Sequence, residues 1–169
     1  MGMIAQYLMI DEETLESLMN LGDEDLLERF IEIEESEKFE VIDIDKIWDA
    51  LHFFLTGTSA SRPIEGNKLS EAIVGVHNFT IDGENSEFIT CIENNELNDI
   101  INEILKINFN KLSEEFNPEH MKRLDIYPSG IWKDNKVQLI DEFKSTLSEI
   151  LIFYKKALTS KYHIIVSII

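Results

Sequence analysis

Hydrophobic residues recur at helical spacing along several parts of the chain. The longest pattern runs through residues 137–154, and shorter ones run through residues 26–31, 44–55 and 97–105. Spacings of three and four residues place side chains on one face of an α-helix, so each segment predicts a helix that covers a core. Their predicted buried faces include Ile31, Leu105 and Val137.

Residues that favour helix ends mark further segments. Asp11 predicts the N-cap of a short helix whose buried face extends to Met19. Asparagine followed by proline at residues 117–118 predicts the start of another short helix, which ends at residue 123. Either Asn94 or Asn95 is predicted to cap the helix of residues 97–105.

Two almost uninterrupted hydrophobic runs, residues 3–9 and 162–169, are typical of buried strands, and the second predicts an interior strand of a sheet. Residues 87–92 predict a further strand after an Asp82-Gly83 turn. Residues 69–76 have helical spacing, but residues 72–76 also fit a strand. Together the patterns predict a single α+β domain, with a mixed or antiparallel sheet packed against several helices.

The central pattern has the most complete set of helix signals. Asp43 is predicted to cap its N-terminus, and Gly57 is predicted to end it in the left-handed conformation. One face is hydrophobic and packs on the core, while a narrow flank is polar. The polar flank consists of Asp45, Asp49, His52 and Thr56.

Four segments of the chain resemble the YfbM-like family, small bacterial proteins classed as a domain of unknown function. They are residues 1–4, 42–60, 69–77 and 126–130, in the order expected for the family. The resemblance covers nearly the whole chain and implies one α+β domain over residues 1–169. It carries no established activity and no agreed catalytic residues, so it implies a family without implying a reaction.

Composition constrains the compartment and the partners. Cys91 is the only cysteine, so no intrachain disulfide forms and a reducing, cytoplasmic setting is expected. The N-terminus lacks the basic region of a signal peptide, and no apolar run approaches the roughly 20 residues of a membrane-spanning helix. The formal net charge of -18 argues against binding to nucleic acid or to an anionic membrane surface.

The charge is unevenly distributed along the chain. Residues 11–49 contain 16 acidic and 3 basic residues, whereas residues 106–161 contain 8 acidic and 10 basic residues. An acidic surface attracts basic partners, although such charge runs also serve simply as solvated faces. The candidate partner-binding residues are Glu24, Asp25, Glu28 and Glu32.

A second candidate site follows the polar flank of the central helix. Asp49 and His52 are three residues apart, so their side chains can touch, and a carboxylate beside an imidazole raises the pKa of the histidine. Such a pair suits acid-base chemistry when a substrate lies within reach, but it is also common on exposed helix surfaces. The candidate pocket comprises Asp45, Trp48, Asp49, His52, Thr56, Ser59, His77 and Tyr127.

Metal and anion sites have weaker support from the spacing. The histidines lack the paired spacing of a zinc-binding helix and the chain has no cysteine cluster, so neither a metal nor a cofactor is predicted. Residues 56–62 supply hydroxyl groups and the guanidinium of Arg62, which suit an anion. They follow a helix C-terminus, whose partial negative charge repels anions, so a capping loop is the preferred interpretation.

Two functions are consistent with these observations. The leading hypothesis is a non-enzymatic binding or inhibitor-like protein whose acidic surface docks a basic protein partner. The alternative is an enzyme or small-ligand-binding protein with a polar pocket around His52. The first rests on the charge asymmetry and on the lack of a complete catalytic motif, whereas the second requires His52 and His77 to face one cleft.

Overall fold

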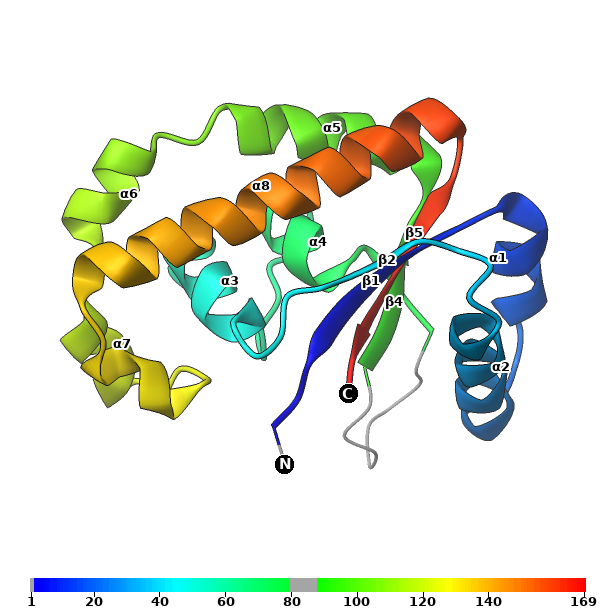
Figure 1. The fold of residues 1–169 in the computed structure, drawn as a ribbon, viewed down its shortest axis with the longest axis horizontal. Helices are drawn as coiled ribbons and strands as arrows, with labels where there is room; N and C mark the ends of the chain where they lie inside the picture. Colours follow the sequence, from blue (N-terminus) through cyan, green and yellow to red (C-terminus); the bar gives the residue numbers. More distant parts are fainter. Residues whose placement is uncertain (1, 80–87) are drawn as a thin grey trace.

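A single antiparallel sheet forms the middle layer of the protein (Figure 1). The computed structural model describes residues 2–79 and 88–169, and within them the strand order is β2-β1-β5-β4-β3. The strands are β1 Ala5–Ile10, β2 Val41–Asp43, β3 His77–Asn78, β4 Phe88–Ile92 and β5 His163–Ile168. Every neighbouring pair is antiparallel, which decides between the mixed and antiparallel sheets that the sequence allowed.

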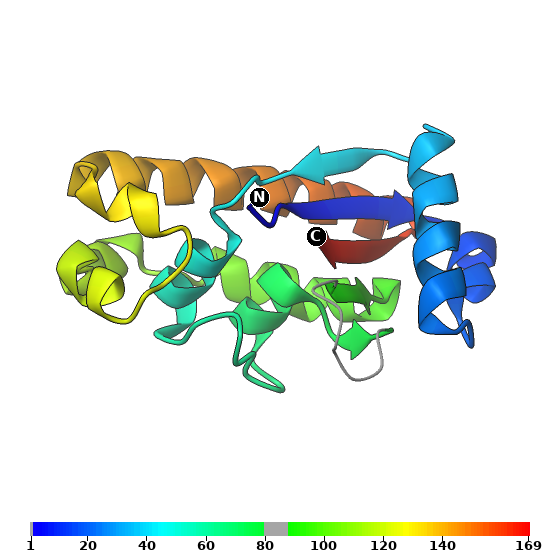
Figure 2. The same ribbon diagram turned by 90° about the horizontal axis from the view of Figure 1, so that it is seen from below.

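Helices cover both faces of the sheet, so the fold has three layers. One face is covered by α1 (Glu12–Leu18) and α2 (Asp23–Glu35). The other is covered by α3 (Trp48–Thr56), α4 (Lys68–Val74), α5 (Asn94–Leu105) and α8 (Lys136–Ser160). Figure 1 shows the two groups of helices on opposite sides of the strands, and Figure 2 shows α8 running alongside β1 and β5. The predicted single-domain α+β class is confirmed.

Short helices continue the fold beyond the sheet. They are α6 (Phe109–Glu115), α7 (Pro118–Arg123) and the 3₁₀-helix η1 (Ser129–Lys133). In Figure 1, α6 and α7 lie at the end of the molecule opposite α1 and α2. In the described part of the chain, no helix combines the length and the hydrophobicity needed to cross a membrane.

Burial on both faces explains the uninterrupted hydrophobic runs of the central strands. In β5, Ile164 and Val166 pack in the core on the α3 and α8 side, while Ile165 packs under α1 and α2. The strand lies between β1 and β4, so the predicted interior position is confirmed. Cys91 of β4 is also buried, and burial raises the pKa of its thiol to about 12, which makes it an inert core residue.

The predicted N-cap of the central helix is wrong. Asp43 is the last residue of β2, where it pairs with Gln6, and its carboxylate accepts a hydrogen bond from the Asp45 N–H at 2.6 Å. The chain then turns through Asp45, whose φ of 53° is left-handed, and α3 begins only at Trp48. Strand pairing therefore overrides the local helix signal, whereas the predicted C-cap at Gly57, with φ of 76°, is confirmed.

Four residues predicted to be buried on helix faces are instead exposed. Leu105 ends α5, Val137 lies in the first turn of α8, and Met19 follows the end of α1. Each of these three residues lies at or just beyond an end of its helix. Ile31 lies within α2, but the buried face of that helix runs through Leu26, Phe30 and Ile33, which turns Ile31 toward solvent.

Other local predictions have mixed outcomes. Residues 69–76 are mainly helical, because Asn67 caps α4 by accepting hydrogen bonds from two backbone N–H groups. The helix at 118–123 is confirmed, with Asn117 as its N-cap. The N-cap of α5 is Glu93 rather than Asn94 or Asn95. The predicted Asp82-Gly83 turn lies outside the described residues, and α6 has no counterpart among the predictions.

Aromatic side chains join α3 to α8 inside the core. The ring centroid of Phe143 lies 4.8 Å from that of Phe54 and 5.6 Å from that of Phe116. Phe143 is completely buried, and its neighbours come from different segments of the chain. This cluster therefore holds α3 and the loop before α7 against the long helix.

Replacing Phe143 with alanine is expected to lower the free energy of unfolding by about 3–5 kcal/mol, because it leaves a cavity in this cluster. Urea denaturation followed by circular dichroism measures the loss. Ile152→Ala is the matched control on the same helix, since Ile152 is 68% exposed and its loss is expected to change stability by less than about 0.5 kcal/mol. Equal losses in the two variants would contradict the packing described here.

Candidate functional site

His52, the central residue of the predicted polar flank, is completely buried. Its Nδ1 lies 2.6 Å from the carbonyl oxygen of Thr58, and its Nε2 lies 2.7 Å from the hydroxyl of Ser70. A carbonyl only accepts, so Nδ1 carries the proton and Nε2 accepts the hydrogen bond from Ser70. The Ser70 oxygen in turn accepts the N–H of Ile64 at 3.0 Å. Both ring nitrogens are therefore engaged within the protein.

Burial also decides the charge of His52. Desolvation lowers the pKa of the imidazole below its ordinary value of 6.5, and it outweighs the hydrogen bond to Thr58 and the charge of Asp49, which raise the pKa. The sequence-based expectation of a raised pKa is wrong, because desolvation of the buried ring outweighs the effect of the carboxylate. At neutral pH, His52 is an uncharged structural residue.

Asp49 is also buried, at 5% exposure, and its carboxylate joins three parts of the chain. One oxygen accepts hydrogen bonds from the Ser59 hydroxyl at 2.9 Å and from the Ala60 N–H at 2.7 Å. The other oxygen accepts the N–H of Tyr127 at 3.0 Å. The carboxylate is therefore directed at these donors and makes no hydrogen bond to His52.

Trp48 and Tyr127 hold the first residues of the chain against α3. The indole N–H of Trp48 donates to the carbonyl of Met3 at 3.0 Å, and the two aromatic rings lie 5.5 Å apart between centroids. The Tyr127 hydroxyl also reaches the Met3 carbonyl, at 3.4 Å. A side chain at Gly2 would approach the Tyr127 hydroxyl to 2.4 Å, so this close approach favours glycine.

Six of the eight candidate residues thus belong to an internal hydrogen-bonding network rather than to one open pocket. Thr56 belongs to it, since its hydroxyl donates to the His52 carbonyl at 2.8 Å. Asp45 is exposed and outside it. His77 is exposed on β3, where its Nε2 lies 2.7 Å from a carboxylate oxygen of Glu96. Thr56, Ser59 and His77 border three different cavities, and His52 borders none of those described.

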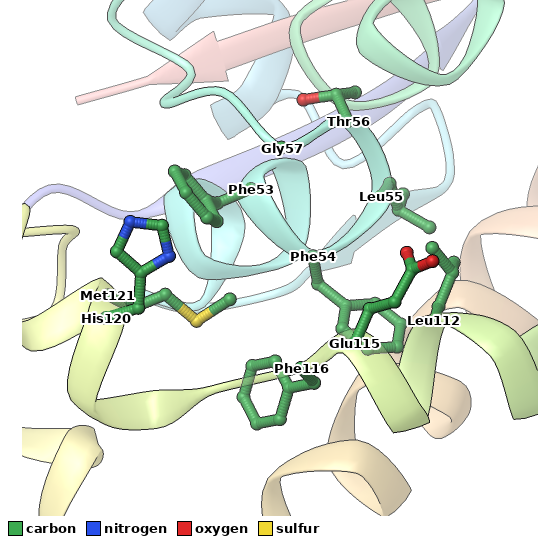
Figure 3. A pocket seen from close by; sticks show the side chains of 10 residues that line it. All are labelled: Phe53, Phe54, Leu55, Thr56, Gly57, Leu112, Glu115, Phe116, His120 and Met121. Carbon is green, nitrogen blue, oxygen red and sulfur yellow. The ribbon is translucent and has the colours of Figure 1, made fainter.

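A cavity of about 410 Å³ opens at the C-terminal end of α3 (Figure 3). Phe53, Phe54 and Phe116 give it an aromatic lining. Glu115 and His120 supply polar groups, and Figure 3 shows them on opposite sides of the cavity. The remaining lining residues are Leu55, Thr56, Gly57, Leu112 and Met121. Sequence reasoning found Thr56 and Gly57 but missed Glu115 and His120, because no local pattern links them to α3.

The other sequence-predicted surface lies on α2. Glu24, Asp25, Glu28 and Glu32 are all exposed, and Arg29 forms an ion pair with Glu32 at 3.1 Å. Within the described residues, no group of three or more histidine, cysteine, aspartate or glutamate side chains is arranged to hold a metal ion.

These features define an α+β protein in which helical layers enclose an antiparallel sheet and a buried polar network surrounds one core helix. A family model described as a domain of unknown function (DUF1877) matches residues 1–167. The chain belongs to this family, and the predicted YfbM-like relationship is confirmed.

Two comparisons agree with this assignment. The chain is 29% identical to protein YfbM of Escherichia coli strain K12 over 172 residues, which cover 100% of this chain and 99% of that protein. It is also similar to the crystal structure of a protein of unknown function, YfbM from Escherichia coli, with a TM-score of 0.78 and 28% identity. That match covers 99% of this chain and 100% of the other chain.

The pKa of His52 is expected to lie below 6.5 in a histidine NMR titration. Asp49→Asn removes the negative charge that favours the imidazolium, so it is expected to lower the pKa further. Because the folded pKa lies below the unfolded one, the contribution of His52 to stability is complete above about pH 6.5 and is lost as the pH falls toward the folded pKa. A pKa above 6.5 would contradict the buried, neutral assignment.

Asp49→Asn is also expected to destabilise the fold by about 1–3 kcal/mol, because the new amide group faces a donor that the carboxylate oxygen had satisfied. Chemical denaturation at pH 7 measures this loss. Asp45→Asn is the matched control, since Asp45 is exposed and asparagine tolerates its left-handed backbone. A control variant as unstable as Asp49→Asn would show that the network is not the cause.

Proposed function

We propose that this protein is a non-enzymatic binding module whose acidic surface on α2 docks a basic protein partner. The observation that carries the proposal is the exposure of Glu24, Asp25, Glu28 and Glu32 together on one helix. Residues 23–35 contain seven acidic residues and a single base, Arg29. The negative potential of this surface attracts a cationic partner and accelerates association.

The geometry of α2 supports the same proposal. Leu26, Phe30 and Ile33 anchor the helix on the sheet, so its acidic face is held on a rigid element. The exposed acidic residues of α1 extend the negative charge beside it. Among the four docking residues, Glu32 pairs with Arg29, and within the described part of the chain the other three form no ion pair.

The state of His52 favours binding over catalysis. A general base needs contact with a substrate, but this imidazole is buried and both of its nitrogens are engaged within the protein. The alternative, an enzyme that uses His52 as its acid-base group, therefore has no imidazole at a surface where a substrate could reach it. A cytoplasmic location, with no binding to nucleic acid, belongs to the same proposal and is supported by the buried free thiol of Cys91 and the net charge of -18.

Replacing Glu24, Asp25, Glu28 and Glu32 with lysine is expected to weaken partner capture by about tenfold or more, because four attractive charges become repulsive. Quantitative affinity capture from cells that make the protein, followed by mass spectrometry, provides the measurement. Wild-type capture is expected to weaken as salt is raised, because salt screens exposed charges.

The matched control reverses four exposed acids elsewhere, Glu114, Glu119, Asp141 and Glu142, which changes the net charge by the same amount. Circular dichroism confirms that each variant is folded. If both variants lose the same partners, the effect reflects net charge, and if neither loses any, the α2 surface does not dock a partner. Either result overturns the proposal.

A further inference from the structure

The cavity at the end of α3 is lined in part by α6 and α7, which lie at the opposite end of the molecule from α2 in Figure 1. Its lining comes from three helices, α3, α6 and α7, and from Phe116 in the connection between the last two. This cavity is therefore a separate site, and a ligand bound in it does not require the proposed docking surface.

The C-terminal ends of two helices bring partial negative charge to this cavity. α3 ends at Thr56, with Gly57 as its C-cap, and both residues line the cavity. The last carbonyls of a helix carry partial negative charge, and α3 has no basic residue in its last turn to balance it. α6 also ends here, at Glu115, and it too has no basic residue in its last turn. Two helix C-termini thus meet at one cavity, and the N-terminal turn of α7, which includes His120, borders the opposite side.

Glu115 adds a full negative charge to this environment. Its side chain lines the cavity in Figure 3, near Leu112 and Phe54. Lys111 precedes it by one helical turn, but among the described residues Glu115 forms no ion pair with Lys111 or with any other cation. The carboxylate is therefore available to a ligand.

Most of the remaining lining is hydrophobic, so it favours a ligand with an apolar part. Phe53 and Phe54 come from α3, and Phe116 and Met121 face them from the α6 and α7 side. Phe54 packs in the aromatic core with Phe116 and Phe143, so this wall is preformed. A volume of about 410 Å³ is within the range of small-molecule sites.

We propose that this cavity binds a small organic ammonium ion, with its cationic group at Glu115 and the C-terminal end of α3 and its apolar part against Phe53, Phe54 and Phe116. Negative helix ends and an unpaired carboxylate favour a cation, and the aromatic lining favours a ligand with a hydrocarbon body over a hydrated metal ion. An anionic ligand of the same shape is repelled by Glu115 and by the C-terminal ends of α3 and α6.

Phenethylammonium is a suitable probe because it combines an ammonium group with a small aromatic body. Titration into the ¹⁵N-labelled protein, followed by NMR, reports both affinity and location. Amide shifts are expected at residues 53–57 and 112–121. The neutral 2-phenylethanol is expected to bind about two- to fivefold more weakly, which corresponds to one exposed ion pair, and phenylacetate more weakly still.

Two carboxamide variants locate the charge. Glu115→Gln is expected to remove the preference for phenethylammonium over 2-phenylethanol while leaving the binding of the neutral compound unchanged. Glu114→Gln is the matched control, since Glu114 is the exposed neighbour that does not line the cavity. The proposal would be overturned if the cation and the anion bound equally, or if the two variants had equal effects. It would also be overturned if the amide shifts lay outside the cavity, or if phenethylammonium did not bind.

Discussion

The buried carboxylate of Asp49 is the interaction on which the arrangement around α3 depends. A charge removed from water is costly unless donors surround it, and this carboxylate has three: Ser59, Ala60 and Tyr127. The donors come from a loop that directly follows the helix and from a segment 78 residues further along the chain. One side chain thus couples local and long-range structure, and His52 does the same for Thr58 and Ser70 on the next turn.

This network also connects the four segments that resemble the family. One of the four resembling segments contains α3, and the other three meet it there. The first contributes the Met3 carbonyl to Trp48, the third contributes Ser70 to His52, and the last contributes Tyr127 to Asp49. Hydrogen bonds therefore hold the first, third and fourth of these segments against α3. The similarity to YfbM, itself described as a protein of unknown function, is in the same way a similarity of fold.

The two proposed surfaces belong to different parts of the fold, and each has its own support in the core. α2 rests on one face of the sheet and exposes its acids, whereas the far end of α3 forms a cavity with α6 and α7. The aromatic cluster of Phe54, Phe116 and Phe143 fixes the cavity wall, and the Asp49 contact to Tyr127 holds the chain just after α7. The core thus provides a rigid support for two surfaces of different chemistry.

The sequence by itself determined the parts of the fold that depend on near neighbours. Hydrophobic spacing predicted α5, α8 and the interior strand β5, while Gly57 and Asn117 correctly predicted an end and a start of helices. Only the tertiary structure decided which competing signal prevailed at Asp43, where pairing with Gln6 outweighs helix capping. It also decided that His52 is buried and that Glu115, from a distant part of the chain, lies beside α3. Spacing reports the geometry of one element, whereas burial, pKa and the lining of a cavity depend on distant segments that the chain brings together.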